Sequence, residues 1–181
     1  MKPLSVLLLA CLLTAALPLP AAAMPDLVIL VRHAEKAADS NDPGLTPEGR
    51  ERAKALKQAL IGLNVNAILT STARRTHDTA APLAQHLHLQ SQPVGGSGDA
   101  HVKAVADAVR AQTGVVLVVG HSNTVPAVIA ALGGPKLAEL CETSFHHAFL
   151  LQPAVPPATE PPRWAHFSYG APSGAPQAGC L

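Results

Sequence analysis

The chain has 181 residues, which is enough for one domain and short for two. Charged residues make up 14% of it, aromatic residues 3%, and the formal net charge is +1 with histidine neutral. A nucleic-acid-binding protein is expected to have a basic surplus and aromatic side chains that stack on bases, so the composition argues against that class. It also argues against disorder, because hydrophobic residues make up 48% of the chain and can form a core.

The first 23 residues have the pattern of a secretory signal peptide. Lys2 gives a short basic start, residues 3–18 (PLSVLLLACLLTAALP) are apolar, and Ala21-Ala22-Ala23 fits an A-x-A cleavage site. The apolar stretch is shorter than the roughly 20 residues of a spanning helix, which argues against a retained membrane anchor. A lipoprotein is the other alternative, because Cys11 follows a small residue, although the apolar run continues past it. We expect cleavage after Ala23, a single domain over residues 24–181, and secretion or a periplasmic location.

Removal of the signal would leave two cysteines, Cys141 and Cys180. An even number of cysteines in an oxidising compartment favours a disulfide between them. Two free thiols are the alternative.

Short apolar runs alternate with segments of helical periodicity along the mature chain. Helices are expected to begin at Thr46-Pro47, near Ala73, at Asp99, and at Ser122 or Asn123, because these residues cap helices or precede an apolar repeat. Strands are expected at residues 26–31, 65–70, 92–94, 114–119, 145–151 and 164–169.

This alternation predicts an α/β fold, a three-layer sandwich with a mostly parallel central sheet and helices on both faces. The last two strands are separated by a proline-rich loop at 153–162 with no helix between them. We therefore expect them to add an antiparallel edge to the sheet.

Polar clusters follow three of the expected strands. The first strand leads into residues 32–36 (RHAEK), the second into residues 71–76 (STARRT), and the strand at 114–119 into residues 120–124 (GHSNT). Ligands of open parallel sheets bind at the carboxyl ends of the strands, so these clusters should meet at one rim. Arginine forks and a helix N-terminus bind phosphate or carboxylate groups, which predicts an anion site with two imidazoles. Zinc is not expected, because no close set of histidines and cysteines has ligand spacing.

These clusters resemble the motifs of the histidine phosphatase superfamily, also called the phosphoglycerate mutase-like family. The R-H-G triplet of that family corresponds to Arg32-His33-Ala34, with alanine in the glycine position. The S-x-x-x-R-x-x-x-T-A run corresponds to residues 71–80 with Arg75 as the matching arginine, and G-H-S corresponds to Gly120-His121-Ser122. Residues 45–49 (LTPEG) are similar to the helix start of the family. The resemblance spans residues 26–133.

The resemblance implies phosphoryl transfer in two steps. His33 would attack phosphorus and form a phosphohistidine, which water then hydrolyses. Arg32, Arg75 and His121 would neutralise the oxygens as charge develops. Two guanidinium groups match the charge of a phosphate dianion, so no metal and no cofactor are expected.

The proton donor for the leaving group is expected between the second helix and the G-H-S strand, where the family usually supplies a carboxylic acid. Asp99 is our candidate, with helix capping as its alternative role and Glu35 as the rival donor. Glu35, Lys36, Ser122 and Asn123 are candidate substrate contacts, although Ser122 and Asn123 could serve only as helix caps.

We therefore expect a small exported phosphatase that acts on phosphomonoesters or on phosphorylated protein. Only about 26 residues (88–114) separate the second helix from the G-H-S strand, so no large cap insertion is expected and the site should be open. The alternative is a catalytically silent domain of the cell envelope that binds a phosphorylated ligand. Keeping two histidines argues against that alternative, because binding alone would need only the arginines. Neither nucleic acid nor stable membrane insertion is expected.

Overall fold

We analysed the fold in a computed structural model, which describes residues 24–38, 40–154, 160–174 and 177–181. The signal peptide predicted at residues 1–23 lies outside the described residues. Within the described ranges, no helix is long and apolar enough to cross a membrane.

A six-stranded sheet forms the middle layer, with strand order β3-β2-β4-β1-β5-β6. The pairs β3–β2, β2–β4 and β4–β1 are parallel, whereas β5 pairs antiparallel with both β1 and β6. This confirms the mostly parallel sheet with an antiparallel C-terminal edge. The strands are β1 (Pro25–Arg32), β2 (Val65–Ser71), β3 (Ser91–Val94), β4 (Gly114–Gly120), β5 (His147–Gln152) and β6 (Arg163–Ser168).

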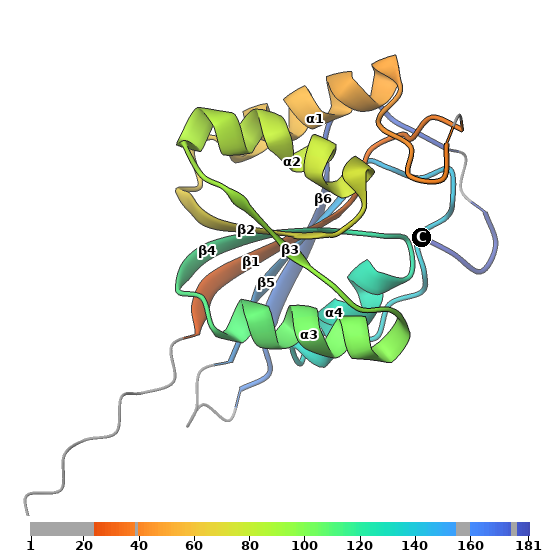
Figure 1. The fold of residues 1–181 in the computed structure, drawn as a ribbon. Coiled ribbons are helices and arrows are strands. Elements are labelled where there is room, and N and C mark those ends of the chain that lie inside the picture. The colour runs from red at the N-terminus through yellow and green to blue at the C-terminus, as the bar shows by residue number, and fades with distance from the viewer. Residues whose placement is uncertain (1–23, 39, 155–159, 175–176) are drawn as a thin grey trace, which may run out of the picture.

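Two helices cover each face of the sheet (Figure 1). Helices α1 (Pro47–Leu60) and α2 (Arg74–Leu87) lie on one side, and α3 (Gly98–Arg110) and α4 (Thr124–Ala131) lie on the other. Alternate residues of β1 enter the two cores. Ile29 packs in the core of α1 and α2, whereas Val28 packs in that of α3 and α4. Both are fully buried, which is the pattern expected of a parallel strand covered on both faces. The predicted three-layer α/β sandwich is confirmed.

The helix starts differ in part from the sequence-based expectation. Thr46 caps α1 as predicted, and its hydroxyl accepts a hydrogen bond from the Gly49 N–H at 3.1 Å. Helix α3 begins two residues earlier than expected, with Ser97 instead of Asp99 at the N-cap, and Gly98 has a positive φ where the loop turns into the helix. Asp99 therefore lies inside the first turn and is not the cap.

Helix α4 also starts without the expected cap. Asn123 occupies the N-cap position of α4, but its side chain makes no capping hydrogen bond. The Thr124 hydroxyl instead accepts the His121 N–H at 3.0 Å. This contact fixes the backbone of His121 where the chain leaves β4.

The C-terminus is fastened to the segment that precedes β5. Cys141 and Cys180 form a disulfide with 5.0 Å between their Cα atoms, which confirms the predicted pairing. The Cys141 N–H donates to the Leu181 carbonyl at 2.6 Å, and the Leu181 N–H donates to the Glu139 carbonyl at 2.9 Å. The disulfide and this short backbone pairing together hold the tail against residues 139–141.

Replacing Cys180 with serine should lower the free energy of unfolding by roughly 3–4 kcal/mol, the loop-closure effect of a cross-link over this separation. Urea denaturation of the oxidised wild type, the reduced wild type and Cys180→Ser measures the effect. The reduced wild type should behave like the variant. Two alkylatable thiols in protein purified from an oxidising compartment, or equal stability of all three samples, would contradict the prediction.

Candidate active site

His33 lies just beyond the carboxyl end of β1, in the centre of the sheet. Its N–H donates to the Gly120 carbonyl at 2.9 Å, which ties it to the end of the neighbouring strand β4. The side chain is 3% exposed. Its Nδ1 lies 2.8 Å from the Ala34 carbonyl, which can only accept, so Nδ1 carries the proton. The lone pair is therefore on Nε2, which is the atom available to attack phosphorus.

Thr79 connects this loop to helix α2. Its hydroxyl accepts the Ala34 N–H at 2.9 Å and donates to the Arg75 carbonyl at 2.7 Å. The threonine of the S-x-x-x-R-x-x-x-T-A run thus fixes the backbone after His33 relative to the first turn of α2. Arg75 is placed beside the site by this contact.

His121 faces His33 from the end of β4. The two ring centroids are 5.4 Å apart and the rings are tilted by 67°. Nη2 of Arg75 lies 3.4 Å from Nδ1 of His121 and can only donate, so Nδ1 accepts and Nε2 carries the proton. Nε2 then donates to the Ser71 hydroxyl at 2.9 Å. Three strand ends therefore meet at one rim, as the parallel order predicts.

Arg32 is buried beneath the site, with 2% of its surface exposed. Its Nη1 donates to the carbonyls of Cys141 and Ser144 at 2.7 and 3.2 Å, and its Nη2 donates to the Glu142 carboxylate at 2.8 Å. The guanidinium carbon lies 4.3 Å from the centre of the Phe145 ring. The segment that enters β5 thus fixes this arginine.

Two buried guanidinium donors, Nε of Arg32 and Nε of Arg75, have no hydrogen-bond partner within the described part of the chain. Unpaired buried donors are costly and therefore rare in proteins. An oxyanion bound beside the two side chains would offer acceptors to them. Among the described residues, no group of three or more histidine, cysteine, aspartate or glutamate side chains is placed to hold a metal ion.

Both imidazoles are neutral at physiological pH. Burial lowers the pKa of His33 to about 3, and the nearby charges of Arg32, His121 and Arg75 act in the same direction. Burial also lowers the pKa of His121 to about 4, with Arg75 as the next cause. A neutral His33 keeps the Nε2 lone pair that a nucleophile needs.

The lowered pKa values predict an acid-sensitive fold. Below about pH 6.5 the unfolded chain binds protons on His33 and His121, while the folded protein does not until about pH 3–4. The free energy of unfolding should therefore decrease as the pH is lowered below about 6.5, by up to about 1.4 kcal/mol per pH unit for each histidine. Urea denaturation at several pH values between 7.5 and 4.5 gives the unfolding free energy as a function of pH. The slope of that dependence should be shallower in His33→Gln than in wild type. It should equal the wild-type slope in His86→Gln, in which an exposed histidine is replaced. An unaltered slope in His33→Gln would contradict the prediction.

Comparison with known proteins finds one family model that matches part of the chain. A family model described as the histidine phosphatase superfamily (branch 1) matches residues 28–95, a range that contains His33 and Arg75. Over these residues the chain is similar to the histidine phosphatase superfamily. No curated protein matches the chain.

Solved histidine phosphatase structures share the fold. The protein histidine phosphatase SixA complexed with tungstate has a TM-score of 0.62 at 19% identity, over 78% of this chain and 96% of that one. A SixA protein of Agrobacterium tumefaciens has a TM-score of 0.60 at 22% identity, over 82% and 99%. A mycobacterial glucosyl-3-phosphoglycerate phosphatase has a TM-score of 0.55 at 19% identity, over 81% and 99%. These likenesses show that the chain shares the fold of these phosphatases.

The structure places Asp99, our candidate proton donor, on the surface of the domain. It is exposed and lines a surface cavity of about 550 Å³ with Asn123 and Lys103, between α3 and α4. No side-chain hydrogen bond or ion pair in the described ranges connects Asp99 with Arg32, His33 or the other site residues. The structure therefore does not bring Asp99 to the imidazoles.

Glu35 and Lys36 have their described contacts outside the anion site. Both carboxylate oxygens of Glu35 accept from Arg52 at 2.7–2.9 Å, and Arg52 also donates to the carbonyls of Tyr169 and Ala171. Glu35 thus helps to hold the C-terminal segment against α1. The Lys36 side chain is exposed, and its backbone pairs with Leu45 in an isolated bridge.

Sequence reasoning missed three residues near the rim, namely Glu142, Phe145 and His101. Glu142 accepts from Arg32 and from the Ser122 hydroxyl, and the Phe145 ring lies 6.2 Å from that of His33. His101 is buried in α3, and its charge would act on His121. The predicted antiparallel edge could have pointed to Glu142 and Phe145, because a strand that pairs antiparallel with β1 begins at the end of the sheet where β1 ends. Residues that enter β5 therefore lie at the same rim.

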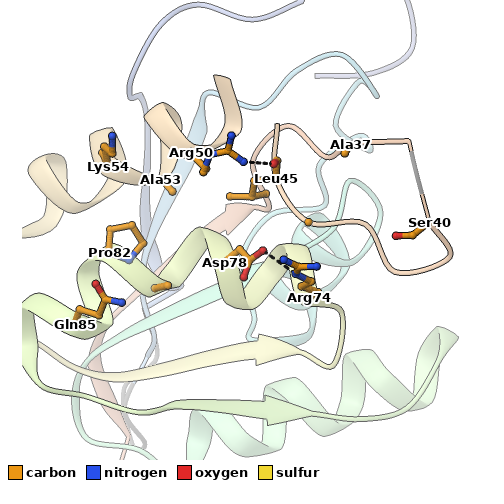
Figure 2. Close-up of a pocket in the computed structure, with 12 residues that line it drawn as sticks. Ala37, Ser40, Leu45, Arg50, Ala53, Lys54, Arg74, Asp78, Pro82 and Gln85 are labelled. Atoms are coloured by element: carbon orange, nitrogen blue, oxygen red, sulfur yellow. Dashed lines mark hydrogen bonds and ion pairs between the residues drawn. The ribbon is translucent and has the colours of Figure 1, made fainter. Parts of the chain in front are cut away.

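A cavity of about 680 Å³ lies elsewhere, between α1, α2 and the loop before α1 (Figure 2). Arg74 lines it and pairs with Asp78 at 3.4 Å, whereas its neighbour Arg75 reaches His121. Neither His33 nor His121 lines this cavity. Arg74 therefore lines this cavity, whereas Arg75 lies at the anion site.

Proposed function

We propose that the protein is a phosphatase that hydrolyses phosphomonoesters, or phosphorylated protein, through a phosphohistidine on His33. The observation that carries the proposal is the state of His33, whose Nδ1–H is held by the Ala34 carbonyl while Nε2 is free and neutral. Arg32 and Arg75 supply positive charge beside it, and the neutral ring of His121 faces it at 5.4 Å between ring centroids. This is the combination that an imidazole nucleophile needs at neutral pH.

The reaction has two displacements at phosphorus. In the first, Nε2 of His33 forms a bond to phosphorus as the bond to the leaving oxygen breaks, and the electron pair leaves with that oxygen, which takes up a proton. In the second, water loses a proton as it attacks phosphorus, the P–N bond breaks, and the electron pair returns to Nε2. The Ala34 carbonyl stabilises the positive charge that the imidazole carries between the steps, because it accepts the Nδ1–H.

Arginine supplies the charge that the phosphoryl group needs in this proposal. The guanidinium groups of Arg32 and Arg75 match a phosphate dianion, and electrostatic stabilisation is the main contribution of a protein to phosphoryl transfer. The mechanism is therefore proposed to need neither metal nor cofactor.

An accessible phosphoryl group suits this site best. Between α2 and β4 the chain forms only β3, α3 and short loops, so that stretch adds no separate cap over the rim. The names of the neighbours, protein histidine phosphatase and glucosyl-3-phosphoglycerate phosphatase, include both a protein and a small ester as substrate. We propose that the site accepts an exposed phosphoryl group of either kind.

We further propose that the protein works outside the cytoplasm, secreted or in the periplasm. The N-terminal sequence pattern supports this, and so does the Cys141–Cys180 disulfide, since such bonds persist in oxidising compartments.

A substrate screen tests the proposed function. Wild type and His33→Ala are assayed on para-nitrophenyl phosphate, alkyl phosphates, phosphoserine peptides and phosphohistidine peptides, with and without EDTA. We expect turnover by the wild type only, unchanged by EDTA. Tight phosphate binding without turnover between pH 4 and 8 would instead indicate a silent binding domain. Activity lost in EDTA and restored by a metal would contradict the metal-free mechanism.

A further inference from the structure

Glu142 is an acidic side chain at the anion site that neither the motifs nor the comparisons assign. Its two oxygens have different partners, with Oε2 on Nη2 of Arg32 at 2.8 Å and Oε1 on the Ser122 hydroxyl at 2.5 Å. The side chain is nevertheless 75% exposed, so it covers the buried Arg32 from the solvent side. A phosphoryl group approaching Arg32 from solvent must therefore meet this carboxylate.

The backbone holds Glu142 firmly in that place. Glu142 lies in a tight turn in which the Ser144 N–H donates to the Cys141 carbonyl at 2.8 Å. The same carbonyl accepts from Arg32, and Cys141 is cross-linked to the C-terminus. The turn, the arginine and the disulfide are thus one connected unit, and the carboxylate projects from it into solvent at the rim.

We propose that Glu142 is the proton-transferring carboxyl group of the reaction, an inference that rests on the proposed phosphatase function. It gives a proton to the leaving oxygen in the first displacement and takes one from water in the second. In the first step the P–O bond breaks, and the oxygen keeps the electron pair and receives the proton of Glu142. In the second, the carboxylate accepts the proton of the attacking water as the P–N bond breaks. The two steps return His33 to its neutral state and Glu142 to its protonated form, which releases its proton to solvent when phosphate leaves.

Charge at the rim explains how Glu142 obtains its proton. The titratable and charged groups that face it are Arg32 and His33 from the end of β1 and His121 from the end of β4. In the free protein, donation by the Ser122 hydroxyl is the main reason why the pKa of Glu142 is low, and Arg32 adds to this. A phosphoryl dianion that takes over Arg32 removes one of these partners and adds two negative charges nearby. Both changes raise the pKa of Glu142 and favour proton uptake as the substrate binds.

Glu35 and Asp99, the proton donors that the sequence suggested, have different surroundings. Glu35 has both oxygens on Arg52, and Asp99 lies in the groove between α3 and α4. Neither carboxylate contacts Arg32 or Ser122 among the described residues. Glu142 is the carboxylate that the structure joins to both a guanidinium of the anion site and a residue of the G-H-S motif.

The test compares Glu142→Gln with Asp99→Asn and with Glu139→Gln, a matched control whose exposed carboxylate lies three residues away. Each variant is assayed on an alkyl phosphate, whose leaving group needs a proton, and on para-nitrophenyl phosphate, whose leaving group does not. Glu142→Gln should lose about 100-fold or more in kcat/KM on the alkyl phosphate and less than about 10-fold on para-nitrophenyl phosphate. The two control variants should change neither value.

Inhibition by inorganic phosphate gives the second readout. Glu142→Gln should bind phosphate at least as tightly as wild type at pH 7, because the competing carboxylate has gone, and this would also show that the site is folded. Equal losses on both substrates, no loss on either, or a selective loss in Asp99→Asn would overturn the assignment. A wild type no more active than His33→Ala would instead overturn the proposed function itself, before any Glu142 variant is considered.

Discussion

The His33→Ala variant is expected to lose roughly 10⁴-fold or more in kcat/KM on every phosphorylated substrate. The loss follows because the variant lacks Nε2 of His33, the neutral imidazole nitrogen that we propose as the nucleophile. His121 cannot replace it, since its Nε2 carries a proton for Ser71 and its Nδ1 accepts from Arg75. Steady-state kinetics on para-nitrophenyl phosphate measures the effect.

His86→Ala is the control for His33→Ala, because this exposed histidine lies near the far end of α2 and should leave kcat/KM unchanged. Binding of inorganic phosphate should survive in His33→Ala, since the arginines remain. A His33→Ala variant that keeps a tenth or more of wild-type activity would contradict the assignment of the nucleophile.

The second large effect is expected from Arg75→Gln. Its Nη2 lies 3.4 Å from Nδ1 of His121 and its positive charge acts on His33, so the guanidinium lies at the anion site. Loss of one such charged donor should lower kcat/KM by about 10²–10³-fold. Stability should change little, because the polar contacts of the side chain among the described residues are a 3.4 Å approach to His121 and a 3.9 Å ion pair with Asp42.

The neighbouring arginine supplies a matched control. Arg74 is 67% exposed and pairs with Asp78 beside a different cavity, so Arg74→Gln should keep near-normal activity. Kinetics of the two variants on the same substrate compares them directly. Equal losses, or a larger loss in Arg74→Gln, would mean that the motif is aligned one residue too far along the chain.

The sequence could predict that the polar strand ends meet, because their meeting follows from the parallel order of the strands and not from side-chain packing. Apolar runs mark β1, β2 and β4, and parallel strands bring their carboxyl ends together. His33, Ser71 and His121 accordingly meet at one rim, although 50 positions separate Ser71 from His121. The two-core packing of β1 follows equally directly from its continuous apolar run.

The surroundings of Arg32 could not be predicted in the same way. Its partners Cys141, Glu142 and Ser144 lie 109–112 positions away, in a turn with no periodicity of its own. Their approach depends on the register of β5 against β1, in which Val31 lies opposite Ala148. A pattern of apolar residues indicates that β5 exists, but it does not specify this register.

The choice of proton donor from the sequence had a similar limit. The resemblance favours Asp99 because it lies between the second helix and the G-H-S strand, and Glu35 is its rival because it lies two residues past His33. The structure shows that Glu35 is held by Arg52, a partner 17 positions away, and that the turn at Gly98 places Asp99 on the outer surface. Side-chain partners of loop residues are set by tertiary packing, which the sequence pattern does not contain.

Trapping the covalent intermediate tests the central claim most directly. Wild type mixed with labelled substrate and quenched within milliseconds should carry one phosphoryl group that is labile in acid and stable in alkali, and peptide mapping should place it on Nε2 of His33. The label should be missing from His33→Ala. A label on serine, aspartate or another histidine, or turnover with no trapped phosphoenzyme, would contradict the account.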